Sequence, residues 1–450
     1  MLSPDYILSK FKDPVPRYTS YPTAPHFKPE LGGTLIERLH SSIKEQERIS
    51  VYVHVPFCDR LCWFCGCHTK HTLKYDPVEA YVSTLTQEIK LVSRRIGFAP
   101  LLGQVHFGGG SPSMLSAEDL SRLRIAFEGA FVIDSDTEIS VEIDPSDGLN
   151  DTLLGLQQLG MTRASIGVQD FDPEVQTAIN RPQTFEQTKS VVDDLRSVGI
   201  HSLNIDALYG LPLQDEVKIA KTMELIVSLA PDRVALFGYA HVPWMKKHQQ
   251  MIKDEDLPGQ QARFDQAELA AKMLIAAGYQ KIGIDHFALP TDTLAIAANQ
   301  KNMRRNFQGY TTDNCEILLP FGASSIGRFQ DGYVQNIVPT GQYQAAIEKG
   351  ELPAAKGMSL SLDDKIRAHI IERLMCDFEI RFNDLSKRFE CAQPYIDELK
   401  SVASAEEDGL CEADGIKFTI PNNARPYTRI VAARFDAYLN KSGARYSKAV

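Results

Sequence analysis

The sequence lacks long apolar runs and any excess of positive charge. No stretch of its 450 residues approaches the uninterrupted apolar length of a membrane span. Lys and Arg number 48 against 58 Asp and Glu, so the formal net charge is −10. A general nucleic-acid binder would be basic instead. These absences argue against a membrane-spanning protein and against a general nucleic-acid binder.

Targeting segments and simple repeats are also missing. Residues 1–5 (MLSPD) show no basic segment leading into an apolar run, so we expect no secretory signal. We therefore predict a cytoplasmic protein whose cysteines are reduced or bound to metal. Without internal repeats or low-complexity tracts, and with 43% hydrophobic residues, the chain has the composition of a globular protein. Its length suffices for one large domain and a smaller one.

Three of the eight cysteines lie close together. Cys58, Cys62 and Cys65 have C-x3-C-x2-C spacing, and Cys67 follows after one further residue. Residues 49–55 before them are β-branched or aromatic and end at a proline, which predicts a strand. The thiol groups should therefore lie on a loop that leaves a strand end, where a site can face solvent and still be held rigidly.

This cysteine spacing indicates a [4Fe–4S] cluster. Such a cluster normally takes four thiolates, so three ligands leave one iron open. C-x3-C-x2-C after an apolar strand resembles the signature of the radical S-adenosylmethionine (SAM) enzymes, in which the open iron binds SAM and reduction releases a 5′-deoxyadenosyl radical. Zinc is the alternative, with His54 or His68 as a further ligand. The sequence lacks the second C-x2-C knuckle of most structural zinc sites, and nothing indicates the oxidising compartment that a disulfide needs.

Strand and helix patterns alternate from residue 49 to about 290. After the strand at 49–55 and a short one at 104–107, we expect strands at 138–143, 163–168, 202–208, 233–239 and 281–285, separated by helices. Alternating units of this kind predict a parallel sheet curved into a full or partial barrel, with its chemistry at the carboxyl ends of the strands. Residues 1–48 form a polar, proline-punctuated arm that we expect to pack on the main domain, and prolines should keep its centre at 15–27 extended. Amphipathic helices such as 362–375, followed by a hairpin at 408–419, predict a small winged-helix-like domain.

Polar and glycine residues gather where the predicted strands end. Residues 108–113 (GGGSPS) follow a strand directly, and glycines there allow close backbone approach to a ligand. Glu142 and Asp144 share one face of another strand; a solvated or ion-paired face is the plain alternative to a ligand-binding role. Further candidates are Gln169, Arg181 and Asp206, with Arg181 suited to a bidentate grip on a carboxylate.

Together these motifs resemble those of the oxygen-independent coproporphyrinogen III oxidases, radical SAM enzymes of haem biosynthesis. The resemblance covers nearly the whole chain. Besides the four cysteines, it is carried by residues 16–24 (PRYTSYPTA), 167–171 (GVQDF), 284–288 (IDHFA) and 306–312 (NFQGYTT). It implies a partial (β/α)6 barrel. The implied parts are an N-terminal arm (1–48), the barrel with its extension (49–355) and a C-terminal, mainly helical, winged-helix-like domain (356–450).

The resemblance also implies the roles of single residues. Cys58, Cys62 and Cys65 would ligate the cluster, with Cys67 a neighbour that is not a ligand. The family can hold two SAM molecules. The positions matching the cluster-bound SAM are Tyr52, Gly109, Glu142 and Ile326. Those matching the second are Phe64, Gly110, Ser111, Gln169, Arg181, Asp206 and Ala240. The family's usual GGGTPT is GGGSPS here, which keeps the hydroxyl groups and loses only methyl groups.

The implied reaction converts two propionates of coproporphyrinogen III to vinyl groups. Four propionates on the substrate call for arginines, and the candidates are Arg17, Arg304, Arg305 and Arg429, although an ordinary surface position is the alternative for each. The implied partners are a low-potential electron donor of the flavodoxin or ferredoxin type, with the chain itself a monomer. Three rival functions are a haem chaperone, a haem-modifying radical SAM methyltransferase and a zinc-stabilised interaction module. The chaperones typically lack the fourth cysteine, the arm motif and the longer C-terminal domain.

Overall fold

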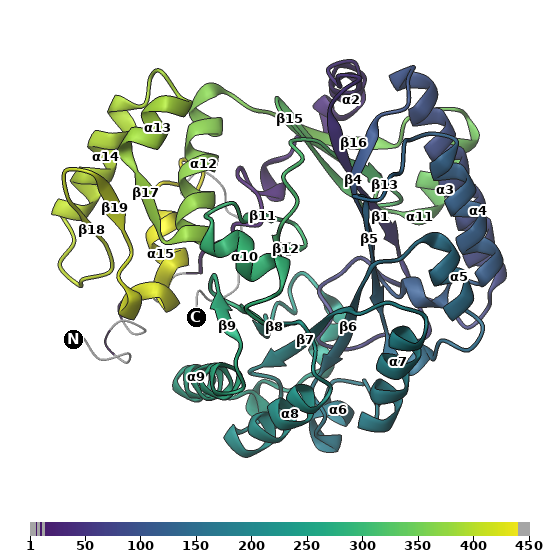
Figure 1. Cartoon of the computed structure of the whole chain (residues 1–450), viewed down its shortest axis with the longest axis horizontal. Helices are drawn as coiled ribbons and strands as arrows, with labels where there is room; N and C mark the ends of the chain where they lie inside the picture. Colours follow the sequence, from purple (N-terminus) through teal and green to yellow (C-terminus); the bar gives the residue numbers. More distant parts are fainter. Residues whose placement is uncertain (1–5, 7–9, 11–13, 440–450) are drawn as a thin grey trace.

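One large sheet organises the molecule (Figure 1). The computed structural model describes residues 6, 10 and 14–439, so the predicted absence of a secretory signal at residues 1–5 lies outside the described residues. The sheet has twelve strands in the order β16-β15-β14-β13-β1-β4-β5-β6-β7-β8-β10-β9. Its centre is parallel: β1 Arg48–Val55, β4 Leu101–Gly109, β5 Glu138–Ile143, β6 Arg163–Gln169, β7 Ser202–Tyr209, β8 Arg233–Gly238 and β13 Leu318–Phe321.

Antiparallel strands extend both edges of the parallel part. One edge carries β14 Ile326–Phe329, β15 Gly332–Asn336 and β16 Ala354–Ser359; the other carries β10 His286–Ala288 and β9 Gln280–Ile282. The sheet is therefore open, which confirms the predicted partial barrel. The predicted boundary at residue 355 lies within β16, and the three-part division of the chain stays a prediction.

Helices connect the parallel strands and cover the outer face of the sheet (Figure 1). They are α3 Asp76–Ile96, α4 Ala117–Glu128, α5 Leu153–Leu159, α6 Pro173–Ala178, α7 Phe185–Ser197, α8 Glu216–Ser228, α9 Gln260–Ala276 and, after β15, α11 Thr340–Glu348. Helix α3 shows why the sequence folds this way. Its apolar side chains recur at helical spacing, and Val78, Val82 and Leu85 are fully buried against the strands.

One sequence prediction about local structure is wrong. Residues 281–285 were expected to form one strand, but Gly283 has a φ of +57° and turns the chain, so that β9 and β10 form an antiparallel pair. Beyond the centre of the arm, residues Gly32–His40 form helix α2, for which no element was predicted from the sequence. Its buried face of Leu35, Ile36 and Leu39 supplies the helical period that the prolines before it obscure.

The C-terminal part is a smaller, mainly helical unit beside the sheet (Figure 1). It contains α12 Leu362–Asp377, α13 Phe382–Arg388, α14 Gln393–Ser404 and α15 Thr428–Ala433, with a sheet of β17 Glu379–Arg381, β19 Lys417–Thr419 and β18 Glu412–Ala413. The predicted hairpin is confirmed as β18 and β19. Between the two parts lie α10 Thr293–Asn299, β11 Arg304–Asn306 and β12 Gly309–Thr311.

The arm links both parts of the molecule. Val15, Tyr18 and Tyr21 are buried in the core of the C-terminal unit, whereas Phe27 stacks on Tyr333 of β15 with 5.5 Å between ring centroids. The prediction that the arm packs on the main domain therefore describes only its second half. No helix in the described part of the chain has the length and apolar character needed to cross a bilayer.

Candidate functional site

The cysteine loop leaves the end of β1, as the sequence predicts. Cys58 lies in β2 Phe57–Cys58, which pairs with β3 Lys70–His71. Cys62 is buried, Cys58 and Cys65 are partly buried, and Cys67 is exposed. The backbone N–H of Cys67 donates to Sγ of Cys65 at 3.3 Å. Hydrogen bonds from the thiol and the backbone N–H of Cys67 lower the pKa of Cys65 to about 7. This shift favours the thiolate form, which ligates metal.

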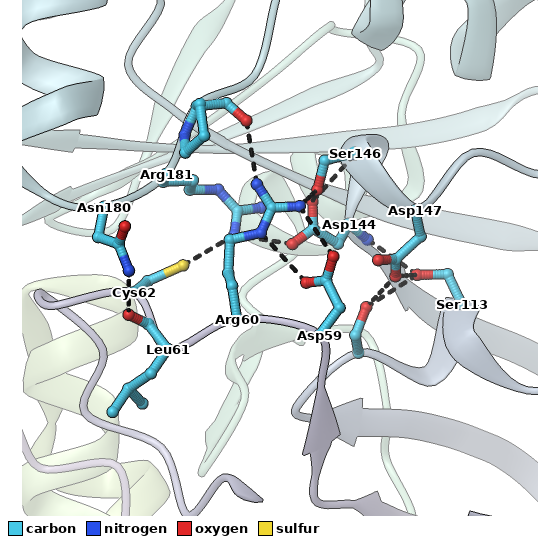
Figure 2. Close-up of polar contacts among 12 residues, drawn as sticks. Asp59, Arg60, Leu61, Cys62, Ser113, Asp144, Ser146, Asp147, Asn180 and Arg181 are labelled. Carbon is cyan, nitrogen blue, oxygen red and sulfur yellow. Dashed lines mark hydrogen bonds and ion pairs between the residues drawn. The ribbon is translucent and has the colours of Figure 1, made fainter. Parts of the chain in front are cut away.

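A guanidinium group faces the second cysteine (Figure 2). Nη1 of Arg181 donates to Sγ of Cys62 at 3.4 Å and to Asp144 at 3.0 Å, and its Nη2 donates to the carbonyl of Gly167 at 2.6 Å. Burial raises the pKa of Cys62, and the positive charge of Arg181 opposes that rise. A cation beside a sulfur atom stabilises a thiolate in this buried position.

A second arginine, which belongs to the loop itself, connects it to neighbouring segments (Figure 2). Arg60 pairs with its neighbour Asp59 at 3.1 Å and donates to Oγ of Ser146. Asn180 also holds the loop, donating its amide to the carbonyl of Leu61 at 2.9 Å. The loop is therefore tied to the segments that follow β5 and α6.

A third set of contacts comes from the segment after β8. Lys246 Nζ donates to the carbonyl of Cys67 at 2.8 Å, and Gln249 Nε2 donates to the carbonyl of Phe64 at 2.9 Å. Nε2 of His248 lies 2.7 Å from the carbonyl of Cys65. These three side chains satisfy loop carbonyl groups that no strand or helix would pair.

The residues of the loop fit a [4Fe–4S] cluster better than a single ion. In the described part of the chain, no three His, Cys, Asp or Glu side chains converge closely enough to hold one metal ion. A cluster spreads its thiolate ligands over different iron atoms, so it does not require such convergence. All eight cysteines are free, and Cys58, Cys62 and Cys65 present thiols from one fastened loop. The zinc alternative receives no support from this geometry.

The structure joins three of the four residues predicted for the cluster-bound SAM. Glu142 accepts the backbone N–H of Gly109 at 2.9 Å and lies 3.2 Å from Nε2 of His106. The ring of Tyr52 stacks on His106 with 5.9 Å between centroids, and its hydroxyl lies 3.0 Å from Nδ1 of His54. Burial lowers the pKa of His54 to about 4, so this imidazole is neutral near pH 7.

Ile326 has no polar side chain with which to join that group, but it is close along the sheet. It begins β14, whose neighbour β13 places Pro320 opposite Tyr52. Its side chain is half-buried beside the cluster of Phe27, Tyr333 and Met358. The glycines are explained by packing within the protein itself, since a Cβ on Gly109 would collide with the ring of His54.

The residues predicted for the second SAM fall into smaller groups. The side chains of Gln169 and Arg181 both approach Gly167, where a Cβ would lie 3.1 Å from each. Asp206 accepts from Ser165 at 3.1 Å and from Asn204 at 2.8 Å. Burial, reinforced by the charge of Glu142, raises the pKa of Asp206 to about 6.

The remaining predicted residues lie around this group. Ser111 is buried and donates to Asp147, a carboxylate that also accepts from Ser113 at 2.8 Å (Figure 2). Gly110 donates its N–H to the carbonyl of Val55 at 2.8 Å. Phe64 packs beside an apolar cluster that includes Leu208 and Leu211. Ala240 follows the end of β8 and has no polar side chain with which to bind.

Sequence reasoning missed several residues of this region. His106 sits in β4 before the glycines, on the face that meets Glu142, and its place in an otherwise apolar strand was the available signal. Asp147 had no comparable signal. Burial raises its pKa to about 6, with Asp144 adding to the rise, and only the fold brings it to Ser111 and Ser113.

Comparison with known proteins agrees with this site. The Radical SAM superfamily profile matches residues 52–226, which contain the cysteine loop and strands β4 to β7. The oxygen-independent coproporphyrinogen III oxidase of Bradyrhizobium diazoefficiens is 45% identical over 449 residues, covering 99% of both chains. The protein of the same name from Escherichia coli is 37% identical over 97% of this chain and 95% of its own.

A solved structure is also similar to this chain over nearly its whole length. Coproporphyrinogen III oxidase from Escherichia coli, described as a radical SAM enzyme, superposes with a TM-score of 0.89 and 37% identity, covering 97% of this chain and 99% of the other. A [4Fe–4S] cluster and SAM follow from this superfamily. From its cysteine loop, its open barrel and relatives that match along nearly its entire length, the chain belongs to the oxygen-independent coproporphyrinogen III oxidase family of radical SAM enzymes.

Proposed function

We propose that this chain converts coproporphyrinogen III to protoporphyrinogen IX in haem biosynthesis. Two propionate side chains become vinyl groups, and each loses a hydrogen atom, CO2 and one electron. The observation that carries the proposal is the match, over 97% or more of this chain, to relatives and a solved structure that bear the oxidase name. The chaperone and methyltransferase alternatives have no comparable support.

When bound, the [4Fe–4S] cluster and SAM supply a 5′-deoxyadenosyl radical, which can remove a hydrogen atom from a propionate β-carbon that no side-chain base deprotonates at neutral pH. We assign Cys58, Cys62 and Cys65 as the cluster ligands, with Cys67 a neighbour that donates to Cys65. Arg181 orients Cys62 through its hydrogen bond to the sulfur. The shared loop and its fastened carbonyl groups support this assignment.

We assign Tyr52, Gly109, Glu142 and Ile326 to the cluster-bound SAM. Burial acts to raise the pKa of Glu142, but His106 and the N–H of Gly109 outweigh it and leave the pKa below its usual value. The carboxylate therefore suits the amino group or ribose hydroxyls of SAM. His54 and His106 hold Tyr52 and Glu142 in place through their ring nitrogens. These contacts support a rigid site that orients one ligand.

We further propose a second SAM position next to the first. Its residues are Phe64, Gly110, Ser111, Gln169, Arg181, Asp206 and Ala240. The approach of Gln169 and Arg181 to the same glycine supports a shared ligand for these two. When ionised, the carboxylate of Asp206 can accept hydrogen bonds from the ribose hydroxyls of SAM.

The setting of the reaction completes the proposal. Eight free cysteines are typical of a reducing compartment, which supports a cytoplasmic location. Cluster reduction requires a low-potential donor of the flavodoxin or ferredoxin type. We propose that the chain works as a monomer, with residues 1–48 as an arm, 49–355 as the barrel and its extension, and 356–450 as the C-terminal domain.

An anaerobic assay tests the function. The full chain is reconstituted with iron and sulfide and mixed with SAM, dithionite and coproporphyrinogen III, and the products are followed by mass spectrometry. We expect loss of two CO2 per substrate with formation of 5′-deoxyadenosine. Equilibrium dialysis of the same sample should find two SAM per chain.

The Cys62→Ser variant is the matched control and should lose both the cluster and all SAM cleavage. Iron content like that of the unmodified chain in this variant would contradict the ligand assignment. Porphyrin or haem binding without decarboxylation in the unmodified chain would favour the chaperone, and transfer of a methyl group would favour the methyltransferase. Either result would overturn the proposed function.

A further inference from the structure

A group of arginines lies at the ends of β7 and β8, beside the proposed second SAM position. Arg17 comes from the arm, Arg263 from α9 and Arg305 from β11. Ala235 of β8 lies opposite Asp206 of β7 on one side and opposite His286 of β10 on the other. Strand β7, which carries Asp206, and strand β10, which is next to the arginines, therefore flank β8. The group therefore borders the proposed active site.

Arg17 reaches the site from the arm. Its Nη2 donates to the carbonyl of Gly238, the last residue of β8, at 2.9 Å, and the side chain is exposed to solvent. The arm beneath it is held firmly. Buried Arg429 donates to the carbonyls of Val15 and Pro16, and Arg305 lies within hydrogen-bonding distance of the carbonyl of Arg17, at 3.4 Å. Arg429 thus positions the arm.

Arg305 is buried with donors to spare. It is 7% exposed, and its Nε and Nη1 have no hydrogen-bond partner in the described part of the chain. Its guanidinium carbon lies 4.4 Å from the ring centroid of Tyr310, which holds the planar group in one orientation. A buried guanidinium with unsatisfied donors is unfavourable unless a ligand supplies the acceptors.

Arg263 has a similar shortage of acceptors. Its Nη2 donates to the carbonyl of Tyr239 at 2.8 Å, and Nη1 lies 3.5 Å from the carbonyl of Gly210. Its buried Nε has no partner among the described residues. Among the described residues, its hydrogen bonds are thus to uncharged carbonyl groups.

Positive charge exceeds negative charge around these side chains. Among the described residues, the only carboxylate within 4 Å of Arg17, Arg263 or Arg305 is Asp285, which lies 3.9 Å from Arg305. Asp285 is engaged on its other oxygen by Nδ1 of His286 at 2.7 Å. Burial together with Arg17 and Arg305 lowers the pKa of Arg429 to about 9, as expected where cations outnumber anions.

We propose that Arg17 and Arg305, flanked by Arg263, form a subsite for a carboxylate of the substrate, specifically a propionate that is not decarboxylated. This inference rests on the proposed function, which deepens here to the recognition of one substrate group. An arginine fork binds a carboxylate through two parallel hydrogen bonds. Such binding stabilises the carboxylate and therefore opposes its loss as CO2, so the subsite anchors a retained propionate while another reacts.

The subsite revises the list of arginines drawn from the sequence. Arg304, the neighbour of Arg305 on β11, is engaged by Glu372 at 3.0 Å and Glu316 at 3.3 Å. Its charge is already balanced, so we exclude it from the subsite. Arg429 holds the arm, and Arg263 joins from helix α9, where no motif marked it.

Binding of coproporphyrin III, a stable fluorescent porphyrin with four carboxylates, tests the subsite on the full chain. Its tetramethyl ester has the same ring without the charges. We expect Arg17→Gln to weaken binding of the acid by about tenfold to a hundredfold, the usual effect of a lost charge-assisted hydrogen bond, and to leave ester binding unchanged. Arg304→Gln is the matched control and should affect neither ligand. Arg305→Gln should resemble Arg17→Gln.

Kinetics on the reconstituted chain give a second readout. Arg17→Gln should raise the KM for coproporphyrinogen III by at least tenfold with a smaller change in kcat, whereas the control Arg304→Gln should leave both parameters unchanged. Unchanged acid binding in Arg17→Gln, or equal loss of acid and ester binding, would overturn the subsite. The two proposals separate because an unmodified chain that prefers acid over ester but releases no CO2 would refute only the proposed function. Arg17 is exposed, so its variant should fold even if Arg305→Gln does not.

Discussion

Asp206 illustrates how a single residue balances stability against ligand binding. Two hydrogen bonds from Ser165 and Asn204 hold its carboxylate, yet burial and the nearby Glu142 raise its pKa to about 6. Its ordinary pKa in an unfolded chain is about 3.9. Folding therefore favours the protonated form, whereas binding to ribose hydroxyls favours the ionised form.

This difference predicts a pH dependence of stability. Because the folded chain holds the proton more tightly, the contribution of Asp206 is most favourable below pH 4 and is lost as the pH rises through 6. Asp206→Asn keeps the shape and removes the titration. We expect this variant, without SAM, to be more stable than the unmodified chain above pH 6, with the gain shrinking toward pH 4.

Urea unfolding of the apo chain at pH 4, 6 and 8 measures this effect. The exposed Asp136→Asn serves as the control and should leave stability unchanged at all three values. A gain for Asp206→Asn that does not depend on pH would contradict the assigned pKa shift. Loss of the second SAM in dialysis should accompany the gain in stability, since the acceptor charge is gone.

Residue-level prediction succeeded where a motif fixed local spacing. The cysteines, Glu142 and Gly109 were identifiable because each lies at or just beyond the end of a strand. Asp147 and Arg263 were not, because each reaches the site only through packing between elements distant in sequence. The roles given to the SAM-binding residues stay predictions.

Among the elements, long periodic segments were the most predictable. Strand β5 has the predicted bounds, and helix α3 carries apolar side chains at the helical spacing that marks one buried face. The strand expected at 281–285 was wrong because apolar and polar residues alternate there by chance across a glycine turn. Segment 242–251, which fastens the cysteine loop, carried no periodic signal.

Gln249 of that segment gives a prediction. It is buried, accepts the N–H of Val242 and donates to the carbonyl of Phe64 at 2.9 Å. Gln249→Ala leaves both groups without their partner at a cost of about 1–3 kcal/mol each and should loosen the cysteine loop. We expect faster release of iron to a chelator from the reconstituted variant.

The adjacent Gln250 is exposed, so Gln250→Ala is the control and should release iron at the unmodified rate. Absorbance of the cluster during the chelator challenge follows both variants. Equal release rates in Gln249→Ala and Gln250→Ala would show that the segment does not support the loop.

At the scale of the whole molecule, the arm and the C-terminal unit share one core. Tyr21 is 3% exposed, packs in that core and accepts the backbone N–H of Ala437 at 3.0 Å. Tyr21→Ala should lower the free energy of unfolding by about 3–5 kcal/mol, as for other large buried aromatic side chains. Tyr21→Phe keeps the ring and should lose only about 1 kcal/mol.

Urea denaturation distinguishes these two variants. Similar losses in both would mean that the ring contributes little and that the arm is not part of the core. A large loss only in Tyr21→Ala would support the shared core, and the same variant should raise the KM for substrate because Arg17 is carried by the arm.

The union of arm and C-terminal core also has a consequence for biosynthesis. Val15, Tyr18 and Tyr21 share a buried core with side chains from residues 366–435, which leave the ribosome hundreds of residues later. The cysteine loop and parallel strands can fold during translation, but Arg17 reaches Gly238 in a fixed position only afterwards. A nascent chain would thus complete its substrate-binding side last, so that only a finished polypeptide can hold the substrate beside the cysteine loop.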